Sequence, residues 1–221
     1  AKSVFVLSDF AVKEKKLMYG IQALNITGAL EDDIFQYKPN NIEDFGAYKN
    51  KLLTIARLDD KDKRIDILLV AYSKFLKKNP NSILVIGGSG SEYRNLINLS
   101  IELNIDANVK FVGFIPDEKL YDYYSSADLF VSIDCADFRI TSYESMAMKT
   151  KVLLSSETDV DESLVKTGYY HLTEPTPEDT AINIEKALSS TTLSKNSDFI
   201  NILKKYTWSS YFSKIEKIIS D

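Results

Sequence analysis

The sequence has very few of the residues on which several common site chemistries depend. Among its 221 residues there is one cysteine, Cys135, and one histidine, His171. A lone cysteine excludes a disulfide framework and a zinc site built from cysteines. A lone histidine leaves little basis for a histidine-ligated metal or a serine–histidine nucleophile. We therefore expect no metal site built on cysteine or histidine, and we interpret His171, which follows a Gly-Tyr-Tyr turn, as a packing residue.

Long apolar runs and excess positive charge are also missing. No apolar stretch approaches the ~18 residues of a membrane-spanning helix, so the sequence predicts no transmembrane segment. The formal net charge of -5 argues against a nucleic-acid-binding protein, which normally presents a basic face. We expect a cytoplasmic protein. Lys214 and Lys217 of the last predicted helix could touch an anionic membrane from the side, although a solvated polar face is the simpler interpretation.

Short apolar segments alternate with amphipathic ones through the middle of the chain. Continuous apolar strands that alternate with helices are typical of a parallel sheet covered on both faces. The predicted fold is therefore α/β, with a doubly wound parallel sheet and extra helices at the termini. In such sheets ligands bind at the carboxyl ends of the strands. Strands are predicted at residues 51–57, 82–87, 109–114, 127–133 and 151–156.

The two ends of the chain depart from this alternation. Residues 1–46 predict a short strand, a helix that stops at Gly20, and an irregular linker. Residues 47–190 hold the alternating pattern, and residues 191–221 predict closing helices, the last one with Thr207 as its N-cap. We therefore divide the chain into these three parts.

Basic residues and glycines follow the first two predicted strands. Arg57 is one of only four arginines, and Lys63 lies six residues later at the next helix start, so the pair can meet one anion from two sides. The alternative is a solvated loop of mixed charge. Gly88 and Gly90 indicate a tight turn, or the start of a dinucleotide fingerprint whose third glycine position is Tyr93.

An acidic residue, Glu144, lies beside the apolar Met-Ala-Met segment that follows the fourth predicted strand. A buried glutamate needs hydrogen-bond partners. A ribose diol offers two donors to one carboxylate. The alternative interpretation is a charge that favours a helix start.

Six short segments follow one another along the chain: Ala56-Arg57-Leu58 with Lys63, Gly88-Ser89-Gly90, Phe111-Val112-Gly113-Phe114-Ile115-Pro116, Ala127-Asp128-Leu129-Phe130-Val131-Ser132, Glu144-Ser145-Met146-Ala147, and Lys151-Val152-Leu153-Leu154-Ser155-Ser156. Taken in this order, they resemble the motifs of the GT-B glycosyltransferases, in their retaining, glycogen synthase-like branch (family four). The similar part is the carboxyl-terminal, nucleotide-sugar-binding domain, and the similarity covers about residues 51–165.

The resemblance implies a role for each of these positions. Arg57 and Lys63 would bind the donor diphosphate, Glu144 the ribose hydroxyls, and the backbone around Phe114 and Ile115 the base. The donor would be a nucleoside diphosphate sugar, used without a metal or other cofactor and with retention of the anomeric configuration. The remaining expected cleft positions are Gly88, Gly90 and the backbone amides of Phe138, Arg139 and Ile140.

The resemblance also implies partners. Residues 1–46 resemble the end of the family's amino-terminal domain and the linker that follows it, and residues 191–221 resemble the helices that cross back. The rest of that domain, or a partner chain, would hold an acceptor, which is an unidentified sugar or a lipid-linked hydroxyl.

The sequence departs from the family pattern near the expected sugar subsite. The family's first glutamate, eight positions before Glu144, is Ala136, and its two glycines are Asp137 and Arg139. Asp137 is the first candidate to restore the carboxylate and, with Glu144, to be catalytic, and Asp134 is the second. At about 5 Å and an effective dielectric near 20, a carboxylate and a phosphate charge repel by roughly 3 kcal/mol. Asp137 must therefore face sugar hydroxyls or be offset by Arg139, which could instead add a third cation for the phosphates.

Two other functions stay open on the sequence. A nucleotide-sugar-binding subunit without turnover is compatible with Ala136. A different doubly wound nucleotide enzyme, such as an epimerase or a dinucleotide oxidoreductase, would need a fuller glycine fingerprint than this one.

Overall fold

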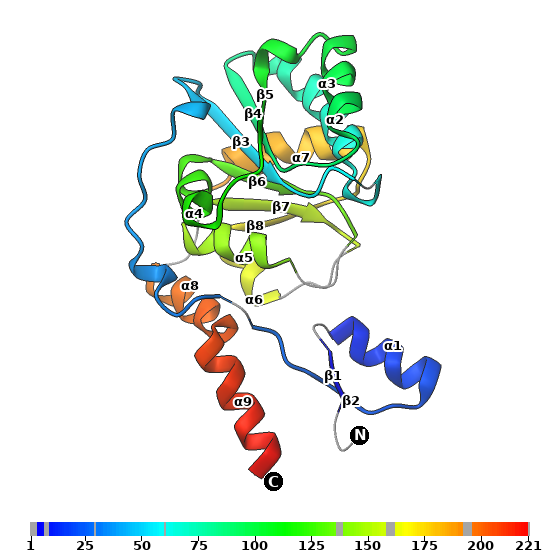
Figure 1. The fold of residues 1–221 in the computed structure, drawn as a ribbon, viewed down its shortest axis with the longest axis vertical. Coiled ribbons are helices and arrows are strands. Elements are labelled where there is room, and N and C mark those ends of the chain that lie inside the picture. Colours follow the sequence, from blue (N-terminus) through cyan, green and yellow to red (C-terminus); the bar gives the residue numbers. More distant parts are fainter. Residues whose placement is uncertain are drawn as a thin grey trace.

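A six-stranded parallel sheet forms the centre of the computed structural model, which describes residues 4–6, 9–28, 30–59, 61–135, 139–157, 162–191 and 196–220. The strand order is β5-β4-β3-β6-β7-β8, and every neighbouring pair is parallel (Figure 1). The predicted α/β fold with a parallel sheet is therefore confirmed. The strands are β3 (Asn50–Ile55), β4 (Ser82–Gly87), β5 (Val109–Gly113), β6 (Leu129–Ser132), β7 (Lys151–Ser155) and β8 (Tyr170–Thr173).

Helices cover both faces of the sheet because its strands are apolar on both sides. Leu52 packs into one buried cluster and its neighbour Leu53 into another, as expected where successive side chains point to opposite faces. The cluster with Leu52 includes residues of α2 (Ile65–Lys78), α3 (Tyr93–Glu102) and α7 (Pro177–Ser189). The cluster with Leu53 includes residues of α4 (Asp117–Ser126), α5 (Ile140–Ala147), α6 (Glu162–Val165) and α8 (Asn196–Leu203).

The strand order creates a switch point at the middle of the sheet. The chain runs outward from β3 through β4 to β5, and then crosses back to place β6 on the other side of β3. Loops that leave β3 and β6 therefore diverge at the carboxyl edge, which is where open α/β sheets bind ligands. Arg57 follows β3 and Asp134 follows β6 at this edge.

Two strands were not predicted from the sequence. β8 lies where we expected only a Gly-Tyr-Tyr turn, and His171 is part of it. Its ring Nε2 lies 3.1 Å from the carbonyl oxygen of Gly168, and burial lowers its pKa, which fits a packing role. The other strand, β2 (Ala23–Asn25), lies in the region that we predicted as a linker. It pairs with β1 (Val4–Val6), which is the short strand predicted near the start of the chain. Both unexpected strands have four residues or fewer, so they have little periodicity to detect.

The terminal segments meet each other and the central core. β1, α1 (Asp9–Tyr19) and β2 form a small unit that Figure 1 shows apart from the main sheet. The backbone of Leu30 then exchanges hydrogen bonds with residues on both sides of Thr207. The Thr207 hydroxyl accepts from the Ser210 amide at 3.4 Å, as an N-cap of α9 (Trp208–Ser220) does. Leu30 and Phe199 also pack in the Leu53 cluster, so residues from both terminal parts contribute to the central core. The division of the chain into three parts at residues 46 and 190 therefore stays a prediction.

No helix in the described ranges has both the length and the apolar character that a membrane span requires.

The loops that follow β3 and β4 are locked together. The Leu58 amide donates to the Ser89 carbonyl at 2.9 Å, and the Glu92 amide donates to the Leu58 carbonyl at 2.7 Å. Gly88 makes this contact possible, because its φ is +128° and a Cβ there would lie 1.8 Å from the carbonyl oxygen of Ala56. The Gly-Ser-Gly segment is therefore the tight turn that the sequence predicted.

We expect Gly88→Ala to destabilise the chain by about 3 kcal/mol, because the clash is with backbone and no side-chain rotation relieves it. Gly113→Ala is the matched control. Gly113 also has a positive φ, +71°, but nothing lies within 4 Å of its added Cβ. That variant should lose only the ~1–2 kcal/mol of left-handed strain. Urea unfolding measures both values, and equal losses would show that close approach at Gly88 is unimportant.

Candidate functional site

A cavity of about 290 Å³ opens at the carboxyl edge of the sheet. It is formed by the last residue of β3, by the residues that follow β3, β4 and β5, and by the first turns of α4 and α5. Four predicted site residues, Arg57, Gly88, Phe114 and Ile115, therefore line one space. The full lining is Ile55, Ala56, Arg57, Gly88, Ser89, Phe114, Ile115, Asp117, Leu120 and Thr141.

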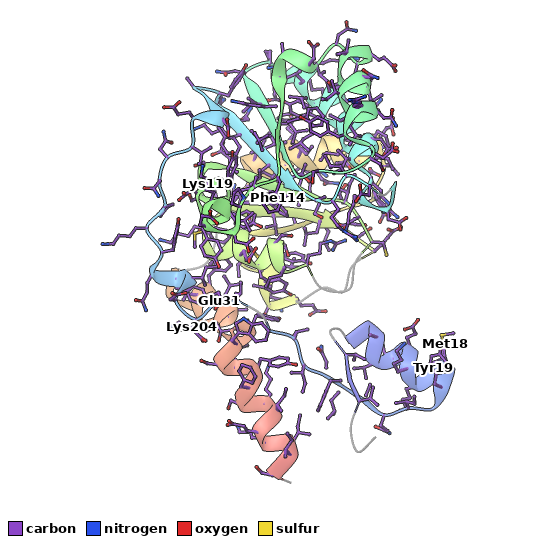
Figure 2. The ribbon with its side chains drawn as sticks, viewed as in Figure 1. Met18, Tyr19, Glu31, Phe114, Lys119 and Lys204 are labelled. Atoms are coloured by element: carbon purple, nitrogen blue, oxygen red, sulfur yellow. The ribbon has the colours of Figure 1, made fainter. Side chains whose placement is uncertain are left out.

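One wall of this cavity is apolar and includes an exposed aromatic ring. The Phe114 side chain, labelled in Figure 2, is 72% exposed, whereas the neighbouring Ile115 is buried. An aromatic ring that is so little buried in the core has a face free to stack on a flat heterocycle. The exposed Arg57 lies on the β3 side of the same cavity, so a ligand there can meet both an apolar surface and a cation.

Glu144 lies one helical turn beyond Thr141 on α5 and is half-buried. The hydroxyl of Tyr124, on α4, donates to its Oε2 at 3.0 Å. Burial raises the pKa of Glu144, the hydrogen bond from Tyr124 opposes that effect, and the charges of Asp117 and Glu31 add to it. The net direction is upward. Glu144 thus has the hydrogen-bond partner that a partly buried carboxylate needs.

A second group of charged residues connects the loop after β3 with the loop after β6, on the two sides of the switch point. Lys63 Nζ lies 2.7 Å from Asp134 Oδ2, and Arg139 Nε lies 2.8 Å from Asp134 Oδ1. A second nitrogen of Arg139 donates to the Asp134 carbonyl, and Ser132 Oγ donates to Oδ1 at 2.6 Å. Asp134 and Arg139 are both buried. The group therefore consists of two cations joined by one shared, buried carboxylate.

These partners keep Asp134 ionised. Burial raises its pKa, but the hydrogen bonds from Lys63 and Ser132 and the charge of Arg139 outweigh burial and lower the pKa to about 2. Among the described residues, Nη1 of Arg139 is buried without a hydrogen-bond partner. Arg139 is thus primarily the partner of Asp134, and its expected contact with phosphate stays a prediction.

Arg64, next to Lys63, adopts a left-handed conformation, with φ 52° and ψ 33°. Such a conformation costs a residue other than glycine about 1–2 kcal/mol. Its Nη1 donates to the Ile133 carbonyl at 3.1 Å and to Glu157 Oε2 at 2.6 Å. The strained corner before α2 is therefore held against the loops that follow β6 and β7.

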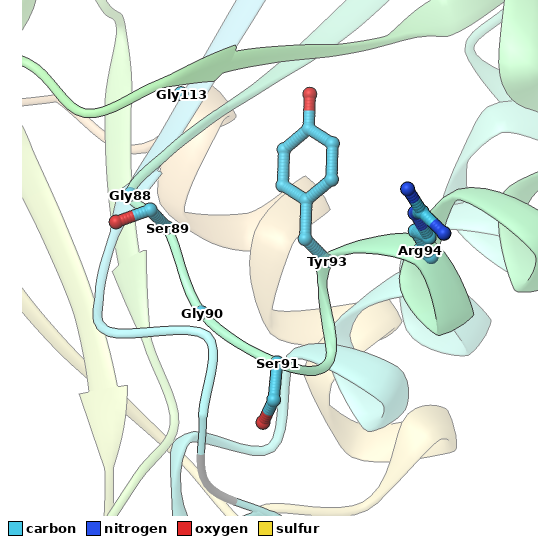
Figure 3. Close-up of a pocket in the computed structure, with 7 residues that line it drawn as sticks. All are labelled: Gly88, Ser89, Gly90, Ser91, Tyr93, Arg94 and Gly113. Atoms are coloured by element: carbon cyan, nitrogen blue, oxygen red, sulfur yellow. The ribbon is translucent and has the colours of Figure 1, made fainter.

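A larger cavity of about 430 Å³ adjoins the first one across the glycine turn (Figure 3). Gly88 and Ser89 line both cavities. On its far side, Figure 3 shows Tyr93 and Arg94 at the start of α3. The glycine turn thus forms a wall common to the two cavities and is not a complete dinucleotide-binding loop.

The structure places the other predicted residues as follows. Ile140 begins α5, next to the cavity residue Thr141. Asp137 and Phe138, like Ala136, lie outside the described residues. In the parts of the chain that the structure describes, no three histidine, cysteine, aspartate or glutamate side chains gather as metal ligands do.

Six lining residues were not predicted as site residues: Ile55, Ala56, Ser89, Asp117, Leu120 and Thr141. Ala56 and Ser89 do belong to the segments that resemble the family's motifs. Thr141 could have been found, since a residue three positions before Glu144 lies on the same face of a helix. Asp117 lies in the first turn of α4, where a carboxylate also suits a helix start, so its type alone does not mark it as a cavity residue.

Comparisons with known proteins add independent findings. The profile of a family described as "Glycosyl transferases group 1" matches residues 38–206. A probable sucrose-phosphate synthase of Thermosipho melanesiensis is 26% identical, covering 97% of this chain and 54% of that protein. An alpha-monoglucosyldiacylglycerol synthase of Streptococcus pneumoniae is 32% identical over 103 residues, which are 46% of this chain and 23% of that protein.

Solved structures of similar fold include Anabaena HepE in complex with UDP. Its TM-score is 0.81 at 17% identity, and the superposition covers 100% of this chain and 64% of that one. At this identity the likeness shows the fold. The chain spans about half the length of the synthase from Thermosipho melanesiensis.

The lowered pKa of Asp134 predicts a specific pH dependence of stability. The folded value is about 2 and an unfolded aspartate titrates near 4, so the unfolded state binds more protons between these values. The stability advantage of the wild type over Asp134→Asn should be complete above about pH 5 and should fall by about 2 kcal/mol as the pH drops toward 2. Urea unfolding of both proteins at pH 6, 4 and 3 measures this difference. A difference that stays constant would contradict the prediction.

Proposed function

The chain belongs to the group 1 glycosyl transferases and has the fold of the carboxyl-terminal half of a GT-B enzyme, and on that premise we propose that it binds the sugar donor for transfer to an acceptor hydroxyl. The resemblance seen in the sequence is thereby confirmed for family and fold. The proposed donor is a nucleoside diphosphate sugar, and the proposed transfer retains the anomeric configuration and needs no metal.

The main support is the cavity that joins Arg57, Phe114 and Ile115 at the switch point. Phe114 and Ile115 supply the apolar surface for a base. Glu144, one turn beyond Thr141, supplies a carboxylate for the ribose diol. Arg57 supplies a cation for the two phosphates. Lys63, which lines neither of the two cavities and lies just before α2, would supply a second one.

In this proposal the protein's chemical contribution is electrostatic. As the bond between sugar and phosphate breaks, negative charge grows on the departing diphosphate. Fixed cations aimed at that charge stabilise the transition state more than the ground state. Arg57 and Lys63 would fill this role, and the acceptor hydroxyl would attack on the face that the nucleotide leaves. Asp137 stays the first candidate for a carboxylate at the sugar.

We expect Arg57→Ala to weaken binding of UDP or GDP by about 10- to 100-fold, the loss of one charge-assisted hydrogen bond. It should leave binding of the nucleoside unchanged. Glu144→Gln should weaken nucleoside and diphosphate alike, because both contain the ribose. Isothermal titration calorimetry with UDP, GDP and their nucleosides measures these affinities.

Arg94→Ala is the matched control, since Arg94 lines the cavity on the other side of the glycine turn. It should leave the ratio of diphosphate to nucleoside affinity unchanged. A wild-type chain that binds neither diphosphate more tightly than its nucleoside would refute the proposed donor site.

A second candidate is a donor-binding subunit without turnover, which Ala136 favours because a carboxylate occupies that position in the family. Hydrolysis of UDP-glucose or GDP-mannose by the chain separates the two functions. We expect slow release of the nucleoside diphosphate that Arg57→Ala abolishes. Tight donor binding with no hydrolysis above that of the Arg57→Ala chain would favour the subunit instead.

A further inference from the structure

Asp134 differs from the other acidic side chains of the site in its burial and in the number of its partners. It is 4% exposed, and its carboxylate accepts hydrogen bonds from Lys63, Ser132 and Arg139. Lys63 precedes α2, whereas Asp134 follows β6. The hydrogen bond between them therefore spans the point where the loops of β3 and β6 diverge.

The bond to Asp134 restrains a side chain that is otherwise flexible. A lysine side chain has four rotatable carbon–carbon bonds, about which it loses much conformational entropy when a ligand fixes it. Its ammonium has three hydrogen-bond donors. Asp134 accepts from Lys63 Nζ at 2.7 Å, and the Lys63 side chain remains 27% exposed. The remaining donors can thus meet a ligand while the ammonium is already in place.

We propose that Asp134 is a positioning residue that holds the Lys63 ammonium where the donor diphosphate binds, an inference that rests on the proposed function. Asp134 itself touches no ligand in this account. It acts only by holding the Lys63 ammonium in place.

Arg139 removes the electrostatic disadvantage of such an arrangement. A carboxylate without a partner at this corner would repel the diphosphate and offset the charge of Lys63. Arg139 is 6% exposed, and its Nε lies 2.8 Å from Asp134 Oδ1. The Asp134–Arg139 pair is neutral overall, so the positive charge of Lys63 stays effective toward a ligand.

Arg64, the next residue in the chain, restrains the main chain of Lys63. The left-handed Arg64 is held by the Ile133 carbonyl, one residue before Asp134. The main chain beside Lys63 and the end of its side chain are therefore both attached to the loop after β6. A lysine restrained at both ends presents its charge at one place.

The double variant Asp134→Asn/Arg139→Gln tests the proposal, because it removes one negative and one positive charge together. The net charge of the corner is unchanged and the anchor of Lys63 is lost. We expect the ratio of diphosphate to nucleoside affinity to fall about tenfold, since ligand binding must then order the lysine. Calorimetry on the 221-residue chain measures this ratio, with UDP or GDP, whichever the wild type prefers, and the matching nucleoside.

Ser132→Ala is a milder variant that removes one hydrogen bond from Asp134 and leaves both charges in place. It should lower the same ratio about two- to threefold, and it keeps the test valid if the double variant does not fold. The control is Lys74→Gln/Glu178→Gln, an ion pair of 3.1 Å between α2 and α7. It has the same kinds of charge change and should leave the ratio unchanged.

Three results would overturn the proposal. A ratio that rises would mean that Asp134 competes with the diphosphate for Lys63. A parallel fall of diphosphate and nucleoside affinity would mean a purely structural role. A wild-type chain without any preference for the diphosphate would remove the proposed function and this inference together, whereas a wild-type preference that the variants leave intact would remove the inference alone.

Discussion

The switch point between β3 and β6 is the constraint on which the site depends. Two loops diverge there, and a charged residue follows each strand: Arg57 after β3 and Asp134 after β6. Divergent loops leave a space that the sheet itself does not fill. The ion pair between Lys63 and Asp134 links the loop after β3 to the loop after β6. Arg57 and the glycine turn line the cavity at the same carboxyl edge of the sheet.

Burial decides how the charges of the site behave. Asp134 is covered but has three side-chain donors, so its carboxyl group stays ionised, with a pKa near 2. Glu144 is half-buried, and burial together with two acidic neighbours raises its pKa by more than its one neutral donor, Tyr124, lowers it. The same residue class thus gains opposite electrostatic properties from its surroundings. One carboxylate supports cations, and the other is suited to hydroxyl groups.

Much of the sheet and part of the site could be predicted from the sequence for a geometric reason. Apolar strands alternating with helices imply a parallel sheet, and such a sheet gathers all its strand ends at one edge, so Arg57, Gly88 and Phe114 could be grouped without coordinates. The partnership of Asp134 with Lys63 could not, because 71 positions separate the two residues and the contact depends on side-chain orientation. β8 was missed because its four residues include His171 and give no clear periodicity.

The backbone bridge between Leu30 and Thr207 has a mechanical consequence. Leu30 is anchored in the central core and is bonded to the main chain on both sides of Thr207. Just before it, Gly28 leaves so little room beside α9 that an added Cβ would lie 3.0 Å from Tyr211 Cβ. The segment that leads out of β2 is therefore fixed to the start of α9. We expect these contacts to restrict rotation of the unit formed by β1, α1 and β2 toward α9.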